Sequence, residues 1–183
     1  KPNYHPIGLD TDEKLLKHQQ GLYKMLLETE PTFYTTFVFQ RKFSNKNIEQ
    51  LLTYGEQKLD KFYKYIHKNI LGKYWYRPDF VNPQEHIKMY LFPEKIDTHP
   101  HYCGVVEVKN TKMFPRKVEM FLEHSNRIWN TNKELSTGNR DVIVPNGSVD
   151  IQEPISAQKV SRYSTRKQDQ YENYEHYYIS GSK

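Results

Sequence analysis

Residues 86–108 read HIKMYLFPEKIDTHPHYCGVVEV, the clearest strand pattern in the chain. Two runs rich in aromatic and β-branched residues, His86 to Phe92 and about His101 to Val108, are typical of strands. A loop bounded by Pro93 and Pro100 separates the two runs. The spacing therefore predicts a β-hairpin.

Strand and helix patterns also alternate before the hairpin. Residues 33–39 (FYTTFVF) predict a central strand, because β-branched and aromatic side chains favour extended backbone. From Ser44, a typical N-cap, apolar residues recur at helical spacing until Gly72. We expect this long helix to cover one face of the sheet. An earlier stripe, over residues 11–28, predicts an N-terminal packing helix.

After the hairpin, Pro115 is suited to the first turn of a helix that carries Val118 and Trp129. Residues 141–144 and 148–151 flank Pro145-Asn146-Gly147, and Asn-Gly favours a tight turn, so a second hairpin is expected there. A last helix runs from about Ser156 past Lys167. Together these elements predict an α+β fold, an antiparallel sheet flanked by helices.

The expected organisation is one main domain with an extension at each end, as 183 residues suit a single core. The main domain covers residues 31–168. A helical extension precedes it over residues 1–30, and a tyrosine-rich helix or tail follows over residues 169–183.

The composition favours an acidic partner. The formal net charge is +5, and phosphate contacts by Lys and Arg release condensed counterions, so nucleic acid is the commonest such partner. Cys103 is the only cysteine, which excludes an internal disulfide and fits a reducing compartment. No apolar run is long enough to span a bilayer, and we expect a soluble protein with no membrane partner.

Candidate metal ligands gather at the loop and second strand of the hairpin. Side chains alternate along a strand, so His99, His101 and Cys103 should project to one face, with Glu107 further along it. Two imidazoles at alternate positions can hold a divalent cation, which a carboxylate completes. Glu94 or Asp97, expected in the preceding loop, would supply that carboxylate.

A candidate nucleophile lies on the last predicted helix. Tyr163 and Lys167 are four residues apart and share a helix face. A tyrosine attacks phosphorus once it loses its proton, and a metal-polarised phosphate beside a cation makes that feasible near neutral pH. Arg166 and Arg162 could hold flanking phosphates.

HPHYCGVVEV on a strand, followed by a helix, a strand and then VSRYSTRK on a helix, resembles the HUH endonucleases over roughly residues 33–167. The order is similar to that of replication initiators of small plasmids, phages and single-stranded DNA viruses. Relaxases fit less well, because their tyrosine precedes the histidine motif. A transposase of the same superfamily is an alternative reading.

The resemblance implies a ferredoxin-like antiparallel sheet, Mg²⁺ or Mn²⁺ on the strand histidines and a tyrosine nucleophile. It also implies nicking of single-stranded DNA, at an origin or hairpin, to give a 5′-phosphotyrosine and a 3′-hydroxyl that a polymerase extends. Lys159, Arg162 and Tyr34 are the expected DNA contacts. Host polymerase and helicase would be partners, in the host cytoplasm at replicating DNA.

The sequence departs from the family pattern at two places. A register of His, any residue, His followed by Gly would place His101 first and Cys103 at the second histidine, and Cys is a poor ligand for Mg²⁺. Either His99 and His101 form the pair, which we favour, or His101 pairs with Cys103. The family commonly has Lys three residues after Tyr, where this chain has Arg166 with Lys167 next. Either cation could contact the scissile phosphate.

Two rival readings involve no strand cleavage. The first is a nucleic-acid-binding module whose sheet aromatics stack on unpaired bases. Its candidates are Phe33, Phe37, Phe39, Tyr74, Trp75 and Tyr76, which we interpret mainly as core or groove residues. The second is a structural zinc site at His99, His101 and Cys103, which lacks a visible fourth ligand.

Overall fold

The computed structural model describes residues 24–25, 28–41, 48–96, 99–131, 143–153 and 178–180. Within these ranges the chain forms a sheet, two α-helices and a short 3-10 turn. In chain order the elements are β1 (Phe33–Arg41), α2 (Ile48–Leu71), η1 (Pro83–Glu85), β2 (Lys88–Glu94), β3 (His101–Glu107), α3 (Lys117–Thr131), β4 (Ile143–Gln152) and β5 (Tyr178–Ile179).

The sheet has five strands in the order β4-β1-β3-β2-β5, and every neighbouring pair is antiparallel. β2 and β3 form the hairpin that the sequence predicts, in register from Lys88↔Glu107 to Glu94↔His101. β1 lies on the other side of β3, so β3 is paired along both edges. The predicted α+β class is confirmed, with an antiparallel sheet and helices packed on it.

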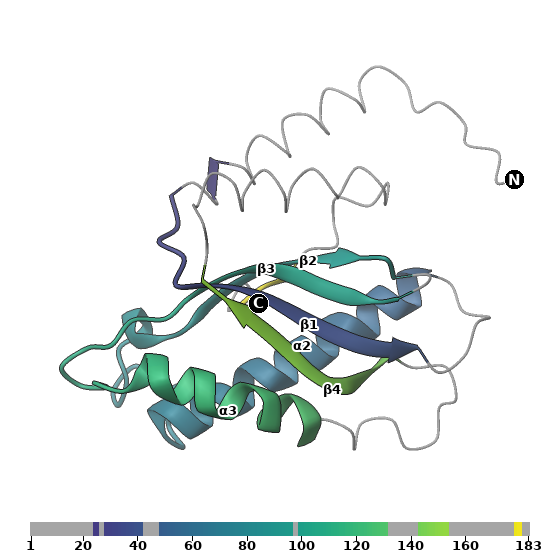
Figure 1. Ribbon diagram of the computed structural model, residues 1–183. Helices are drawn as coiled ribbons and strands as arrows, with labels where there is room; N and C mark the ends of the chain where they lie inside the picture. The colour runs from purple at the N-terminus through teal and green to yellow at the C-terminus, as the bar shows by residue number, and fades with distance from the viewer. Residues whose placement is uncertain are drawn as a thin grey trace, which may run out of the picture.

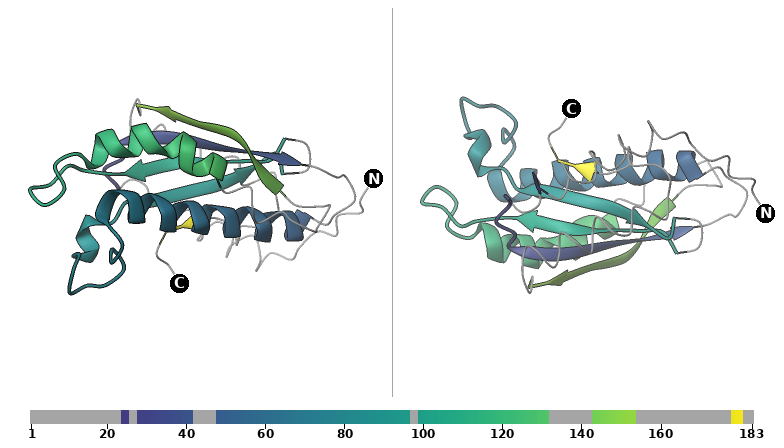
Figure 2. Two further views of the ribbon diagram at one scale, coloured as in Figure 1. Left: turned by 90° about the horizontal axis from the view of Figure 1, so that it is seen from below. Right: turned by 90° about the horizontal axis from the view of Figure 1, so that it is seen from above.

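Both helices lie on the same face of this sheet (Figures 1 and 2). Alternation along β1 directs Phe37 and Phe39 toward them, and Trp129 of α3 meets both rings at centroid distances of 5.0 and 4.9 Å. The Trp129 indole N–H donates to the Val38 carbonyl at 3.1 Å, which satisfies the buried ring. This aromatic cluster fixes α3 against the sheet and completes the core.

Two glycines allow close packing around β3, Gly104 against the backbone of β2 and Gly55 against the Tyr102 ring. A Cβ on Gly104 would overlap the Tyr90 carbonyl oxygen and lie 2.9 Å from the Leu91 Cα. A Cβ on Gly55 in α2 would lie 2.7 Å from the Tyr102 ring, whose hydroxyl donates to the Leu52 carbonyl at 3.2 Å. β3 therefore packs tightly against both β2 and α2.

The predicted second hairpin is wrong. Residues 143–152 form the single strand β4, which pairs with β1 and passes through Asn146-Gly147 without reversing. The pairing jumps between Phe37↔Val149 and Phe39↔Pro145, so the extra residues of β4 form an irregularity in the ladder. The edge of β1 that does not pair with β3 offers β4 more backbone hydrogen bonds than a two-residue turn would. Pairing along this edge therefore overrides the local turn preference.

The ends of the chain are described only in part. Of the helix expected over residues 11–28, Lys24 and Met25 are helical and Glu28 lies in a turn, whereas residues 11–23 and 26–27 lie outside the described residues. The helix expected from about Ser156 past Lys167 also lies outside them. Tyr178 and Ile179 in the tail form β5 on the edge of β2. Among the helices that the structure describes, none has both the length and the apolarity that crossing a membrane requires.

Candidate metal centre

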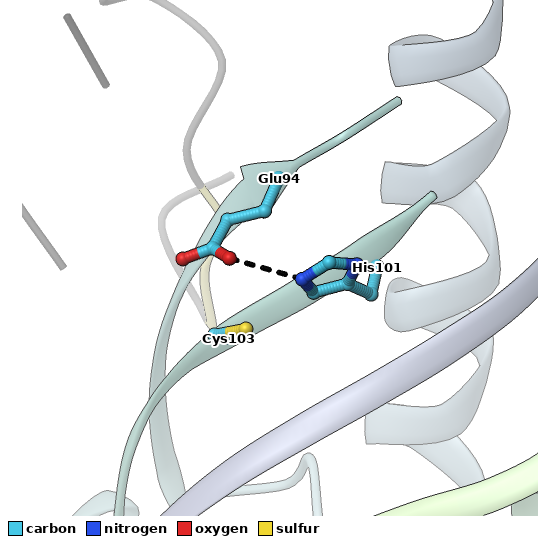
Figure 3. Close-up of side chains that lie close together, drawn as sticks. All are labelled: Glu94, His101 and Cys103. Atoms are coloured by element: carbon cyan, nitrogen blue, oxygen red, sulfur yellow. Dashed lines mark hydrogen bonds and ion pairs between the residues drawn. The ribbon is translucent and has the colours of Figure 1, made fainter. Parts of the chain in front are cut away.

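The candidate centre is built on the β2–β3 hairpin. Tyr102 and Val106 of β3 point into the helix-covered core, so the alternate residues His101 and Cys103 project from the opposite face. We call this side of the sheet the distal face. Cross-strand pairing of Glu94 with His101 brings a carboxylate beside the imidazole, and all three side chains converge (Figure 3).

The three groups are close enough to share an ion. The His101 Nε2 lies 3.0 Å from the Glu94 Oε2, and one ligand atom from each of Glu94, His101 and Cys103 lies within 4.8 Å of the other two. Glu94 is 3% exposed and Cys103 is 5% exposed. Burial of an acidic carboxylate is costly unless positive charge compensates it, which makes this a cation-accepting environment.

The hydrogen bonds of His101 place a proton on Nδ1. Its Nδ1 lies 2.7 Å from the His99 carbonyl oxygen, which can only accept, so Nδ1 carries a proton. Nε2 is then the atom that faces Glu94. Histidine ligands of metals commonly donate the other ring N–H to a carbonyl in this way.

The surroundings of His101 favour positive charge. Burial opposes protonation of the ring, but hydrogen bonds with Cys103, Glu94 and the His99 carbonyl outweigh it and raise the pKa to about 10. Without an ion, the imidazolium and the Glu94 carboxylate form an ion pair. A divalent cation bound between these groups would replace the proton as the source of positive charge.

Thr36 is a site residue that sequence reasoning missed. β1 pairs Thr36 with Cys103, and the Thr36 hydroxyl donates to the Cys103 Sγ at 3.7 Å. Both residues lie on the distal face. The local signal was present as alternation in Phe33–Phe39, but the register between β1 and β3, which joins residues 67 apart, is not readable from either strand alone.

Two expected ligands stand elsewhere than predicted. β3 begins at His101, so His99 precedes the strand and does not share its alternation. The His99 amide donates to the Lys95 carbonyl at 2.8 Å, and its exposed ring lies 5.9 Å from that of His101, outside the group of three. Glu94 was expected in the loop and instead ends β2. Asp97 lies outside the described residues.

The structure therefore brings together Glu94, His101 and Cys103. Of the two pairings considered from the sequence, this grouping contains His101 with Cys103. Glu107 lies at the far end of β3, where it forms an ion pair with Lys88 at 3.6 Å. Tyr34, an expected DNA contact, is half-buried and packs near Phe92 and Val105 on the distal face. Tyr163, Lys167, Arg166, Arg162 and Lys159 lie outside the described residues.

The aromatic residues of the rival reading divide into two groups. Phe33, Phe37 and Phe39 are buried beneath the helices and offer no surface to bases. Tyr74 and Tyr76, in the loop after α2, are 42% and 61% exposed. Trp75 is partly buried against the core.

Comparison with protein-family models, with curated proteins and with solved structures found no match to this chain.

Proposed function

We propose that this chain nicks single-stranded DNA through a covalent phosphotyrosine, as the HUH endonucleases that start rolling-circle replication do. The observation that carries the proposal is the convergence of Glu94, His101 and Cys103 on the distal face. The sequence resemblance requires its metal motif on this strand, and three potential ligands meet there, two of which belong to the motif.

The topology supports the same proposal. Within the described residues the chain runs β1-α2-η1-β2-β3-α3-β4-β5, and the sheet order is β4-β1-β3-β2-β5. This order is compatible with the ferredoxin-like sheet that the resemblance implies. Both helices lie on one face of the sheet (Figure 1). The three potential ligands project from the opposite face.

A cation held at this centre would withdraw charge from a non-bridging oxygen of the scissile phosphate. The chain itself would supply the nucleophile and the cations that steady the phosphate. In the proposed reaction Tyr163 loses its proton, its oxygen bonds to phosphorus, and the bond from phosphorus to the 3′-oxygen breaks. The 3′-oxygen leaves as a hydroxyl once protonated, and the 5′-phosphate stays on the tyrosine. Lys167 or Arg166 would hold the phosphate.

The reaction consumes no water and exchanges one phosphodiester for another. An incoming 3′-hydroxyl can therefore reverse it and join strands. The net charge of +5 supports a polyanionic substrate, since cations on the protein draw DNA toward the centre.

The test uses the full chain and a pool of single-stranded DNA of randomised sequence, labelled at the 3′ end, with a divalent cation. We expect a labelled protein band that survives denaturing electrophoresis. Tyr163→Phe should abolish this band. Affinity for the pool should change by no more than about twofold, because loss of one hydroxyl does not remove the phosphate contacts that dominate affinity. Tyr171→Phe is the matched control and should retain the band. A band that persists in Tyr163→Phe would show that a residue other than Tyr163 is the nucleophile.

One observation favours a second candidate, a nucleic-acid-binding module that performs no cleavage. Tyr74 and Phe80 are exposed and their rings lie 5.0 Å apart, with the Arg77 guanidinium 4.7 Å from the Phe80 ring centroid. Exposed rings beside a cation can stack on unpaired bases. This candidate predicts binding of the pool, sensitive to Tyr74→Ala, with no covalent band under any condition.

A further inference from the structure

The donor atoms of the candidate centre differ in chemical hardness. Glu94 offers oxygen, His101 offers imidazole nitrogen and Cys103 offers sulfur. Mg²⁺ and Mn²⁺ prefer oxygen, whereas imidazole suits zinc and its neighbours and thiolate selects soft or borderline ions. The sulfur of Cys103 is therefore the donor that does not fit the ions that the family resemblance implies.

We propose that the centre formed by Glu94, His101 and Cys103 binds a thiophilic divalent ion of the zinc class and discriminates against Mg²⁺. The inference rests on the proposed function only in placing a catalytic cation at this centre. Binding of the metal itself does not depend on the nicking reaction.

The geometry is close to what a tetrahedral ion needs. Bonds of roughly 2.0 to 2.1 Å from oxygen and nitrogen to zinc place those two ligand atoms about 3.3 Å apart. The Glu94 Oε2 and the His101 Nε2 are 3.0 Å apart, and every ligand atom of the group lies within 4.8 Å of the others. Small side-chain movements would bring all three onto one ion.

The number of ligands indicates the kind of site. Among the residues that the structure describes, three protein ligands converge here. Structural zinc sites have four protein ligands, whereas catalytic zinc sites have three and leave one position for water or substrate. A phosphate oxygen would take that position, so the inferred ion is catalytic in type.

Two further groups hold the ligands in orientation. The His99 carbonyl accepts from the His101 Nδ1–H at 2.7 Å and directs Nε2 into the centre. The Thr36 hydroxyl donates to the Cys103 sulfur at 3.7 Å, a contact that orients the sulfur on the distal face. An imidazole and a thiol each with an orienting partner are typical of a built metal site rather than a chance grouping. We therefore assign Thr36 as a positioning residue.

Titration of the metal-free full chain with Co²⁺ alone tests the inference without DNA. A tetrahedral Co²⁺ ion bound to thiolate gives a charge-transfer absorption in the near ultraviolet, and Cys103 is the only cysteine that can produce it. We expect this band at one equivalent, its loss on addition of Zn²⁺, and no change on addition of Mg²⁺ in large molar excess. Absence of the band, or displacement of Co²⁺ by Mg²⁺, would overturn the proposal.

Variants then assign the effect to the named side chains. Cys103→Ser should remove the sulfur band and weaken Zn²⁺ binding at least about 100-fold, more than loss of an orienting partner usually does. Thr36→Val should retain the band, shift its position and weaken Zn²⁺ binding roughly 10-fold. Thr35→Val is the matched control, because Thr35 neighbours Thr36 in β1 but points into the core. Zn²⁺ affinity that is equal in all three variants would contradict the assignment.

Zinc-class binding at the centre and the nicking reaction can be refuted independently of each other. Tight Zn²⁺ binding without a covalent DNA adduct would leave the metal assignment intact and refute the nicking reaction. An adduct that forms with Mg²⁺, in a protein that shows no sulfur band with Co²⁺, would do the reverse.

Discussion

The imidazole of His101 and the carboxylate of Glu94 face each other across the β2–β3 hairpin, with Nε2 3.0 Å from Oε2. The hairpin fixes this contact, because the two residues are register partners at the point where β2 ends and β3 begins. Their separation depends on backbone pairing more than on side-chain choice. A rigid element thus positions two of the three candidate ligands.

Glu94→Gln should remove the anionic ligand while it retains the shape of the side chain. We expect Zn²⁺ affinity and formation of the DNA adduct to fall by at least about 100-fold, since loss of a ligand exceeds loss of an orienting partner. Calorimetric metal titration and the gel assay measure the two effects. Glu107→Gln, at the other end of the same hairpin, is the matched control. Equal losses in both variants would show a general effect on the sheet.

Gly104→Ala should destabilise the fold through contact between strands. The added Cβ would overlap the Tyr90 carbonyl oxygen, and this backbone atom cannot move without disturbing β2. We expect a loss of about 1 to 3 kcal/mol in the free energy of unfolding, typical of overpacking. Urea denaturation followed by circular dichroism measures it. Gly72→Ala is the contrast: Gly72 has φ of 94° and open space around it, so its cost, about 1 kcal/mol, is conformational alone.

Thr35→Val should stabilise the protein. The Thr35 hydroxyl is buried on the core side of β1 and has no hydrogen-bond partner in the part of the chain that the structure describes. A methyl group in its place removes the cost of burying that polar atom, about 1 kcal/mol. The midpoint of urea unfolding should rise without a change in slope. A lower midpoint would reveal a partner for the hydroxyl.

His67 should make the stability of the fold depend on pH. The ring is fully buried in α2, its Nδ1 lies 2.7 Å from the Tyr63 carbonyl, and its Nε2 accepts from the Ile87 amide at 2.9 Å. Burial lowers its pKa to about 3, the Tyr63 hydrogen bond opposes this, and the charges of His86 and Lys117 add to the lowering. The neutral ring is therefore the form that the folded chain holds.

The unfolded chain binds a proton at His67 below about pH 6.5, whereas the folded chain does not until about pH 3. The stability that neutral His67 contributes is therefore fully present above pH 6.5. As the pH falls from 6.5 to 3, the free energy of unfolding decreases by up to about 1.4 kcal/mol per pH unit. His67→Gln should flatten this slope, and His124→Gln on α3 is the control. Denaturation series at several pH values measure the slope. An unchanged slope in His67→Gln would contradict the assignment.

Local patterns predicted most elements of the fold. The aromatic and β-branched runs and the proline-bounded loop indicated β2 and β3, and the apolar stripes indicated α2 and α3, because each of these signals is local. The hairpin predicted where β4 lies was wrong because its outcome depended on a distant strand. Asn146-Gly147 favours a turn locally, but pairing with the distant edge of β1 decided the outcome.

The site divides in the same way. Spacing alone drew attention to His101, Cys103 and Glu94, which the structure brings together. The preference for His99 assumed that the strand began before it, and pairing with both β1 and β2 begins at His101 instead. Thr36 could not be identified, because its contact with Cys103 depends on a register between strands far apart in sequence.

Intact-mass spectrometry after incubation of the full chain with single-stranded DNA and Zn²⁺ decides whether Tyr163 forms a covalent bond to DNA. We expect a protein species heavier by the mass of the 3′ DNA fragment, with the added phosphate mapped to Tyr163, and no such species in Tyr163→Phe or Glu94→Gln. An unmodified mass with Zn²⁺, Mn²⁺ and Mg²⁺ alike, under conditions where the DNA is bound, would contradict it.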